Sequence, residues 1–117
     1  MITYIFRKPK YPIICNIDGY IFGAKSEVSF LKQIDYVEMD PDKNYDLIDI
    51  SAEGWWFLPN HMAISPLTMK KKWFKKEIIS LYNNRKNSTD GKTYSEKSLS
   101  AKRFDNIFND IVELLKP

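Results

Sequence analysis

With 117 residues, 44% of them hydrophobic and 15% aromatic, the chain can bury a core and is not of the intrinsically disordered class. Its one cysteine, Cys15, excludes an intramolecular disulfide and favours a reducing, cytoplasmic location, and no apolar run approaches the ~20 residues of a membrane span. The net charge of +3 combines −3 over residues 1–66 with +6 over residues 67–117, an asymmetry that favours an acidic partner.

The N-terminal part of the chain predicts β-strands. Residues 2–6 are rich in β-branched and aromatic side chains, which favours a strand. Residues 13–17 and 20–22 flank Asp18-Gly19, a dipeptide typical of tight hairpin turns. We therefore expect one strand followed by a β-hairpin.

The segment over residues 28–36 can be interpreted in two ways. Its apolar side chains of one parity are Val28, Phe30, Ile34 and Tyr36. This alternation predicts a strand, whereas Ser26 could instead cap a short helix. After a polar turn over residues 40–44, residues 45–50 and 55–58 predict two further strands.

The second half of the chain predicts helices. Residues 71–84 carry apolar side chains at helical spacing, namely Phe74, Ile78, Leu81 and Tyr82. This helix begins either after Thr68 or near Trp73, and the second choice places Glu77 in its first turn. Residues 85–97 are polar and predict a loop.

The last predicted helix is amphipathic, and Ser100 is expected to be its N-cap. The apolar residues on one side of its helical wheel are Ala101, Phe104, Ile107, Phe108, Ile111, Val112, Leu114 and Leu115. The predicted fold is therefore α+β, in one domain over residues 1–117. It comprises an antiparallel β-meander in the N-terminal half, followed by two C-terminal helices packed on one face.

The sequence contains no recognisable catalytic apparatus. His61 is the only histidine, and nothing places it beside Cys15 to form a nucleophilic dyad. Residues 40–46 imitate the start of a calcium loop, but Tyr45 stands where a glycine is needed and Ser51 where a bidentate glutamate is needed. We therefore expect no catalytic residue, no metal and no cofactor. An enzyme that uses carboxylates alone stays an alternative.

A basic segment offers one candidate interface, for nucleic acid. Its expected binding residues are Lys70, Lys71, Lys72, Trp73, Lys75 and Lys76, joined by Lys102 and Arg103 in the first turn of the last helix. The cations would neutralise phosphates while a ring stacks on a base. The alternative is a solvated helix face with Phe74 in the core. The excess of 15 lysines over three arginines is also typical of AT-rich genomes.

The tryptophan pair offers a second candidate interface, for a protein partner. Successive side chains of a strand point to opposite faces, so Trp55 and Trp56 cannot both enter one core. Either the sheet is covered on both faces, or one indole is exposed and anchors a partner. Our leading hypothesis is a non-catalytic domain of accessory, inhibitor or immunity type that binds a protein partner or a second copy of itself. The alternative is the nucleic-acid-binding module, and we expect no membrane partner.

Overall fold

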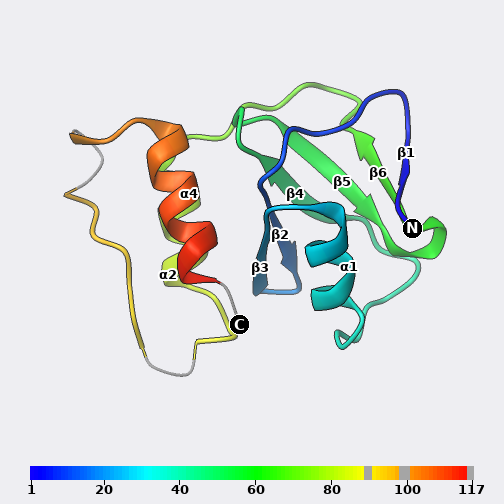
Figure 1. Ribbon diagram of the computed structural model, residues 1–117, viewed down its shortest axis with the longest axis horizontal. Coiled ribbons are helices and arrows are strands. Elements are labelled where there is room, and N and C mark those ends of the chain that lie inside the picture. Colours follow the sequence, from blue (N-terminus) through cyan, green and yellow to red (C-terminus); the bar gives the residue numbers. More distant parts are fainter. Residues whose placement is uncertain (89–90, 98–100, 116–117) are drawn as a thin grey trace.

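One mixed sheet of six strands divides the α+β fold into two layers of buried side chains, with helices on both faces (Figure 1). The computed structural model describes residues 1–88, 91–97 and 101–115. The strands are β1 (Thr3–Tyr4), β2 (Ile13–Ile17), β3 (Tyr20–Ala24), β4 (Tyr45–Asp49), β5 (Gly54–Leu58) and β6 (Ala63–Pro66). The α-helices within the described residues are α1 (Glu27–Ile34), α2 (Lys75–Asn83) and α4 (Phe104–Leu114), and the short helix η1 (Pro59–His61) joins β5 to β6.

The sheet is more complex than the predicted antiparallel meander. Its strand order is β1-β6-β5-β4-β2-β3. The β2–β3 hairpin around Asp18-Gly19 is confirmed, and β4, β5 and β6 do follow one another as antiparallel neighbours. The meander prediction is wrong at two places, because β4 returns beside β2 and β1 pairs in parallel with β6. Both pairings join segments that are distant in sequence, which no local pattern specifies.

Helix α1 occupies the segment whose parity predicted a strand, so that prediction is wrong and the alternative with a Ser26 cap is confirmed. The Ser29 amide donates to Ser26 Oγ at 3.2 Å. Phe30 and Ile34 are buried one turn apart, whereas Tyr36 is 90% exposed. A spacing of four residues satisfies both the strand period and the helix period, and the cap therefore decides between them.

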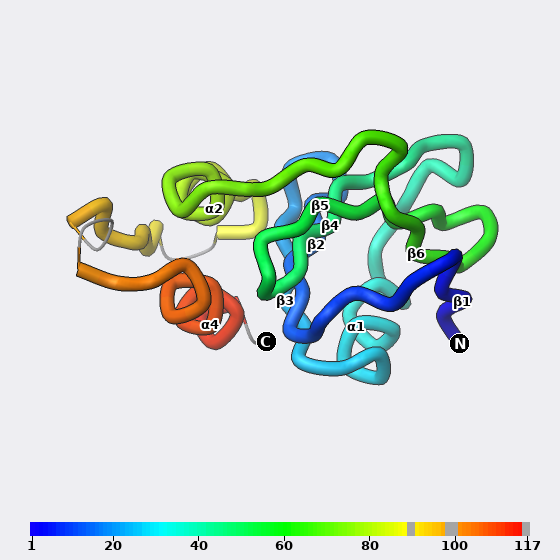
Figure 2. The backbone as a smooth tube through the Cα atoms, turned by 90° about the horizontal axis from the view of Figure 1, so that it is seen from above, coloured from blue at the N-terminus to red at the C-terminus, as the bar shows by residue number. Residues whose placement is uncertain are grey.

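Alternate residues of the central strands enter two separate cores. Toward α1, Cys15, Leu47 and Trp55 pack with Phe30 and Phe57. On the opposite face, the strand residues of the second core come from β2, β3 and β4, and they pack against α2 and α4. Figure 2 shows α1 and the two C-terminal helices on different sides of the sheet. The two C-terminal helices do pack on one face as predicted, but the prediction lacked α1 on the opposite face.

Helix α2 begins at Lys75, close to the later of the two predicted starts. The Phe74 amide donates to Glu77 Oε1 at 3.0 Å, which satisfies one free donor of the first turn. Ile78 and Ile79 are buried. The prediction that Phe74 enters the core is wrong, because its side chain is 70% exposed at the N-cap position.

Helix α4 starts at Phe104, later than expected, and the predicted N-cap Ser100 lies outside the described residues. Lys102 and Arg103 were expected in the first turn; instead they precede the helix, with Arg103 at the N-cap position. The buried face comprises Ile107, Phe108, Ile111 and Val112. No helix among the described residues is both long and apolar enough to cross a membrane.

Candidate anion-binding cleft

The turn between β4 and β5 is held between two basic segments that are far apart in sequence. On one side the Ile50 amide donates to the Lys10 carbonyl at 3.3 Å. On the other side the Gly54 amide donates to the Lys71 carbonyl at 2.9 Å, and the Trp73 amide donates to the Ala52 carbonyl at 2.7 Å. Figure 2 shows this turn between the N-terminal segment and the segment that leads to α2. The backbone thus fixes both segments against one floor.

Asp49 organises that floor. Its carboxylate is buried, with 1% of the residue exposed, and it accepts from five donors. Oδ1 accepts from the Ser51 amide and hydroxyl and from the Glu53 amide, and Oδ2 accepts from the Lys10 amide and from Trp55 Nε1. A buried carboxylate is stable only when its oxygens are satisfied in this way. Asp49 therefore has a structural role.

Arg7 lies over the floor in a fixed position. Its guanidinium donates to Glu53 through two bonds, Nη1 to Oε1 at 3.1 Å and Nη2 to Oε2 at 2.6 Å. Its Cζ lies 4.8 Å from the centroid of the Trp55 ring. The bond from Arg7 lowers the pKa of Glu53, and the nearby charges of Lys70 and Lys10 lower it further. Glu53 therefore neutralises part of the positive charge in this region.

These segments enclose a cleft of about 640 Å³. The cations that line it are Arg7, Lys8, Lys10, Lys70, Lys71 and Lys72, and its two carboxylates are Asp49 and Glu53. The described residues that line the cleft therefore carry a formal net charge of +4. Lys71 lies 3.6 Å from Glu77. Within the part of the chain that the structure describes, Lys8, Lys10, Lys70 and Lys72 make no ion pair.

The basic segment predicted from the sequence is divided by the structure. Lys70, Lys71 and Lys72 lie in an extended strip on the cleft, whereas Lys75 and Lys76 lie in the first turn of α2. Lys76 lines a neighbouring groove of about 820 Å³ together with Trp73 and Phe74. Trp73 is half-buried against the second core, and the Lys71 ammonium lies 4.0 Å from its ring centroid. The predicted residues therefore do not form one helix face.

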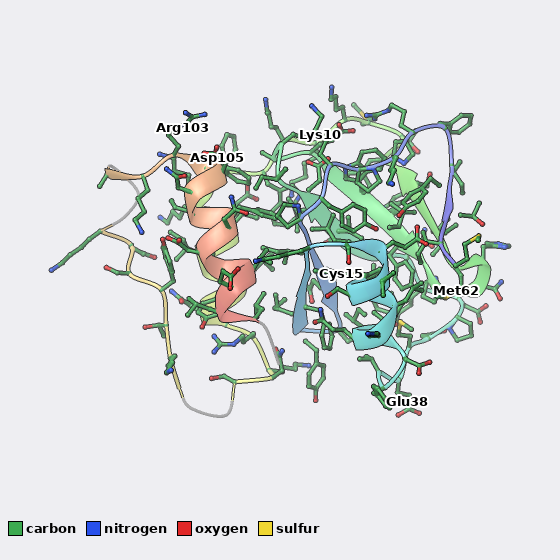
Figure 3. The ribbon with its side chains drawn as sticks, in the orientation of Figure 1. Lys10, Cys15, Glu38, Met62, Arg103 and Asp105 are labelled. Atoms are coloured by element: carbon green, nitrogen blue, oxygen red, sulfur yellow. The ribbon has the colours of Figure 1, made fainter. Side chains whose placement is uncertain are left out.

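Lys102 and Arg103 are not part of the cleft lining. Lys102 Nζ lies 2.7 Å from Asp110 Oδ2, a bond that raises the pKa of the lysine and lowers that of the aspartate. Arg103 Nε lies 3.5 Å from Asp105 Oδ1. Figure 3 shows Arg103 at the start of α4, apart from Lys10, which lies above the sheet. The structure thus separates these two cations from Lys70, Lys71 and Lys72.

The sequence interpretation missed the other rim of the cleft, formed by Arg7, Lys8 and Lys10. These residues belong to the half of the chain with net negative charge, so the charge asymmetry directed attention away from them. The signal that could have found them is local: residues 7–10 hold three cations in four positions. Their placement opposite Lys70–Lys72 depends on the long-range pairing of Lys10 with Asp49 and Ile50.

The tryptophan pair alternates as expected for a strand. Trp55 is 1% exposed and belongs to the core beneath α1, so it is not available to a partner. Trp56 points to the opposite face, is half-buried, and has Asp46 and Ser65 as its register partners on β4 and β6. The helix-covered core on that face takes its strand residues from β2, β3 and β4. Trp56 therefore lies beyond the part of the face that α2 and α4 cover.

The remaining candidate groups of the sequence lie apart from the cleft lining. Cys15 is buried on β2, and burial raises the pKa of its thiol well above the usual range. His61 is exposed on η1. Among residues 1–88, 91–97 and 101–115, no group of three or more His, Cys, Asp or Glu side chains is placed to hold a metal ion.

Comparison with protein-family models, with curated proteins and with solved structures finds no match to this chain.

Proposed function

We propose that this protein is a non-catalytic module that binds a polyanion, namely nucleic acid, in the cleft between residues 7–10 and residues 70–72. The observation that carries the proposal is the assembly of six cations from two distant segments around one concavity. Like charges repel, so a surface gathers them at a cost unless an anion neutralises them. Phosphate groups along a nucleic-acid backbone supply that neutralisation.

The composition of the cleft favours backbone contacts over base reading. Among the described residues that line the cleft, five of the six cations are lysines, which bind phosphate as point charges, and the one arginine, Arg7, is already engaged with Glu53. Bidentate reading of guanine usually requires a free arginine. We therefore expect binding that depends strongly on salt and weakly on sequence.

The test is the salt dependence of oligonucleotide affinity, measured by fluorescence anisotropy. Engagement of Lys8, Lys10, Lys70 and Lys72 predicts a log–log slope of about −2.8 on single strands and about −3.6 on duplex. The double variants Lys8→Gln/Lys10→Gln and Lys70→Gln/Lys72→Gln should each flatten the single-strand slope by about 1.4.

The matched control removes the same charge elsewhere. Lys32→Gln/Lys97→Gln changes two exposed lysines outside the cleft and should leave the slope unchanged. Lys102→Gln/Arg103→Gln tests whether the site extends to the start of α4, and the separation of those residues predicts no change in slope. Absence of binding to single strands, duplex and polyphosphate at low salt would refute the proposal.

A second candidate function, binding of a protein partner or a second copy of this chain, is favoured by Trp56. This half-buried indole lies on β5 beyond the helix-covered part of its face, beside the half-buried Leu58. Large aromatic side chains that stay partly exposed are frequent anchors of interfaces.

Replacement of the two tryptophans separates a core role from an interface role. Trp55→Ala should destabilise the fold by about 3–5 kcal/mol, because it empties a buried site. Trp56→Ala should fold and, if Trp56 is an anchor, weaken self-association or partner binding by about 2 kcal/mol or more. Sedimentation and thermal unfolding measure the two effects. A Trp56→Ala variant that unfolds like Trp55→Ala would contradict the interface.

A further inference from the structure

Phe6, which directly precedes the cleft-lining Arg7, is held in an exposed and strained conformation. Its side chain is 94% exposed, and its φ of 62° lies in the left-handed region that phenylalanine rarely adopts. The Arg7 amide donates to the Ile5 carbonyl at 2.7 Å, so Phe6 is the central residue of a tight γ-turn. The chain thus bends immediately after β1, and the ring projects away from the core.

Neither packing nor backbone preference explains this arrangement. An aromatic ring gains free energy when it is buried, and a left-handed backbone favours glycine or asparagine over phenylalanine. A glycine at position 6 would remove the exposed ring and would adopt the left-handed backbone without strain. Residues with a strained backbone of this kind cluster at active sites and at ligand-binding sites.

The neighbours of Phe6 identify the ligand chemistry. The next two residues, Arg7 and Lys8, line the cationic cleft. An exposed ring next to phosphate-binding cations is the combination with which proteins hold unpaired bases, because every base presents a π-face while its phosphate is neutralised nearby. In a duplex the same base faces are stacked on each other and are not accessible to the ring.

The opposite rim repeats the combination. Lys70, Lys71 and Lys72 are preceded by Met69, which is 83% exposed, and are followed after Trp73 by the exposed Phe74. Exposed apolar side chains therefore flank the cleft-lining cations in the sequence of both segments. Binding of phosphates alone would not require these exposed apolar side chains.

We propose that the cleft takes single-stranded nucleic acid, and that Phe6 stacks on an unpaired base while Lys8 and Lys10 hold the adjacent phosphates. This inference rests on the function proposed above and adds the class of substrate to it. Binding is then governed by charge and by stacking, and duplex is the poorer ligand.

The experiment compares three probes on the same protein: a single-stranded oligonucleotide, the same sequence as duplex, and inorganic polyphosphate. Phe6→Ala should weaken single-strand binding about 5- to 150-fold, the effect of losing one stacked base. Its affinity for polyphosphate should not change, because the cations remain. Phe6→Tyr keeps a stacking ring and should restore single-strand affinity.

Two controls separate stacking from a structural effect. Tyr36→Ala removes another exposed aromatic, 90% exposed after α1, and should leave all three affinities unchanged. Phe6→Gly relieves the left-handed backbone, so it should raise the melting temperature of the free protein and still weaken single-strand binding.

The outcomes distinguish this inference from the proposed function. Equal or tighter binding of duplex, or unchanged single-strand affinity in Phe6→Ala, would overturn the role of Phe6 while the polyanion site stands. Failure to bind any of the three probes would overturn both. Weaker binding of polyphosphate by Phe6→Ala would show a structural effect and would also overturn the stacking role.

Discussion

At the scale of single residues, two buried carboxylates, Asp49 and Glu53, line the cleft together with its exposed cations. Asp49 gathers five donors from four residues and thereby connects Lys10 of the N-terminal segment to the β4–β5 turn and to Trp55. That connection adds to the backbone bond from the Ile50 amide to the Lys10 carbonyl, which also holds the N-terminal rim against the floor. The sequence interpretation found Lys70, Lys71 and Lys72, but a local pattern does not reveal that Asp49 will accept a bond from Lys10, 39 positions away.

Glu53 makes the pH dependence of this site predictable. Its bonds from Arg7 lower its pKa in the folded state, so it stabilises the fold at neutral pH. The stabilisation by ionised Glu53 is fully present at pH values above about 4.3, the pKa of a glutamate in the unfolded chain. It is lost as the pH falls through the lower pKa that Glu53 has in the folded protein. Glu53→Gln should therefore destabilise the protein by about 1–3 kcal/mol at pH 7, and by less in acid.

Urea unfolding across this pH range measures the difference between wild type and Glu53→Gln. The control is Glu38→Gln, an exposed residue of the loop after α1, labelled in Figure 3, whose substitution should stay within about 0.5 kcal/mol. If the difference between wild type and Glu53→Gln were the same at neutral and acid pH, the charged bond to Arg7 would not stabilise the fold.

At the scale of elements, the sequence predicts those that carry their own end signals. The hairpin is marked by Asp18-Gly19, and the start of α2 by Glu77, which accepts from the Phe74 amide. The segment of α1 was misassigned because its hydrophobic spacing suits both periods and only Ser26 distinguishes them. End signals are thus more decisive than periodicity in elements as short as these.

The start of α4 shows the limit of the same reasoning. Ser100 is a good cap by residue type, yet the helix begins at Phe104 with Arg103 as its N-cap and without a side-chain cap bond. Ile107, Phe108, Ile111 and Val112 lie on the predicted apolar side and are buried. The hydrophobic pattern therefore predicts which face of this helix is buried. The residue at which the helix begins depends on tertiary context, which the pattern does not describe.

At the scale of the whole molecule, folding brings together cations from two halves of the chain whose net charges have opposite signs. The N-terminal half has a net charge of −3, yet it contributes Arg7, Lys8 and Lys10 to a cleft that is lined by six cations of the described residues. The parallel pairing of β1 with β6 and the bond from Lys10 to Asp49 place these cations opposite Lys70–Lys72. Half of the candidate site was therefore predictable from composition, and the other half follows only from topology.

Because the cleft exists only in the folded chain, a ligand of the cleft should stabilise the fold. The unfolded chain carries the same charges but does not hold them around one site. A single-stranded oligonucleotide at a hundred times its Kd should raise the free energy of unfolding by about 2.7 kcal/mol. A variant with Lys8, Lys10, Lys70 and Lys72 all changed to Gln should gain much less at that concentration, because its affinity is lower. Thermal unfolding with and without oligonucleotide measures both. A ligand that lowers the melting temperature would bind the unfolded chain better than the native one, and the assembly of the two basic segments would then have no role in binding.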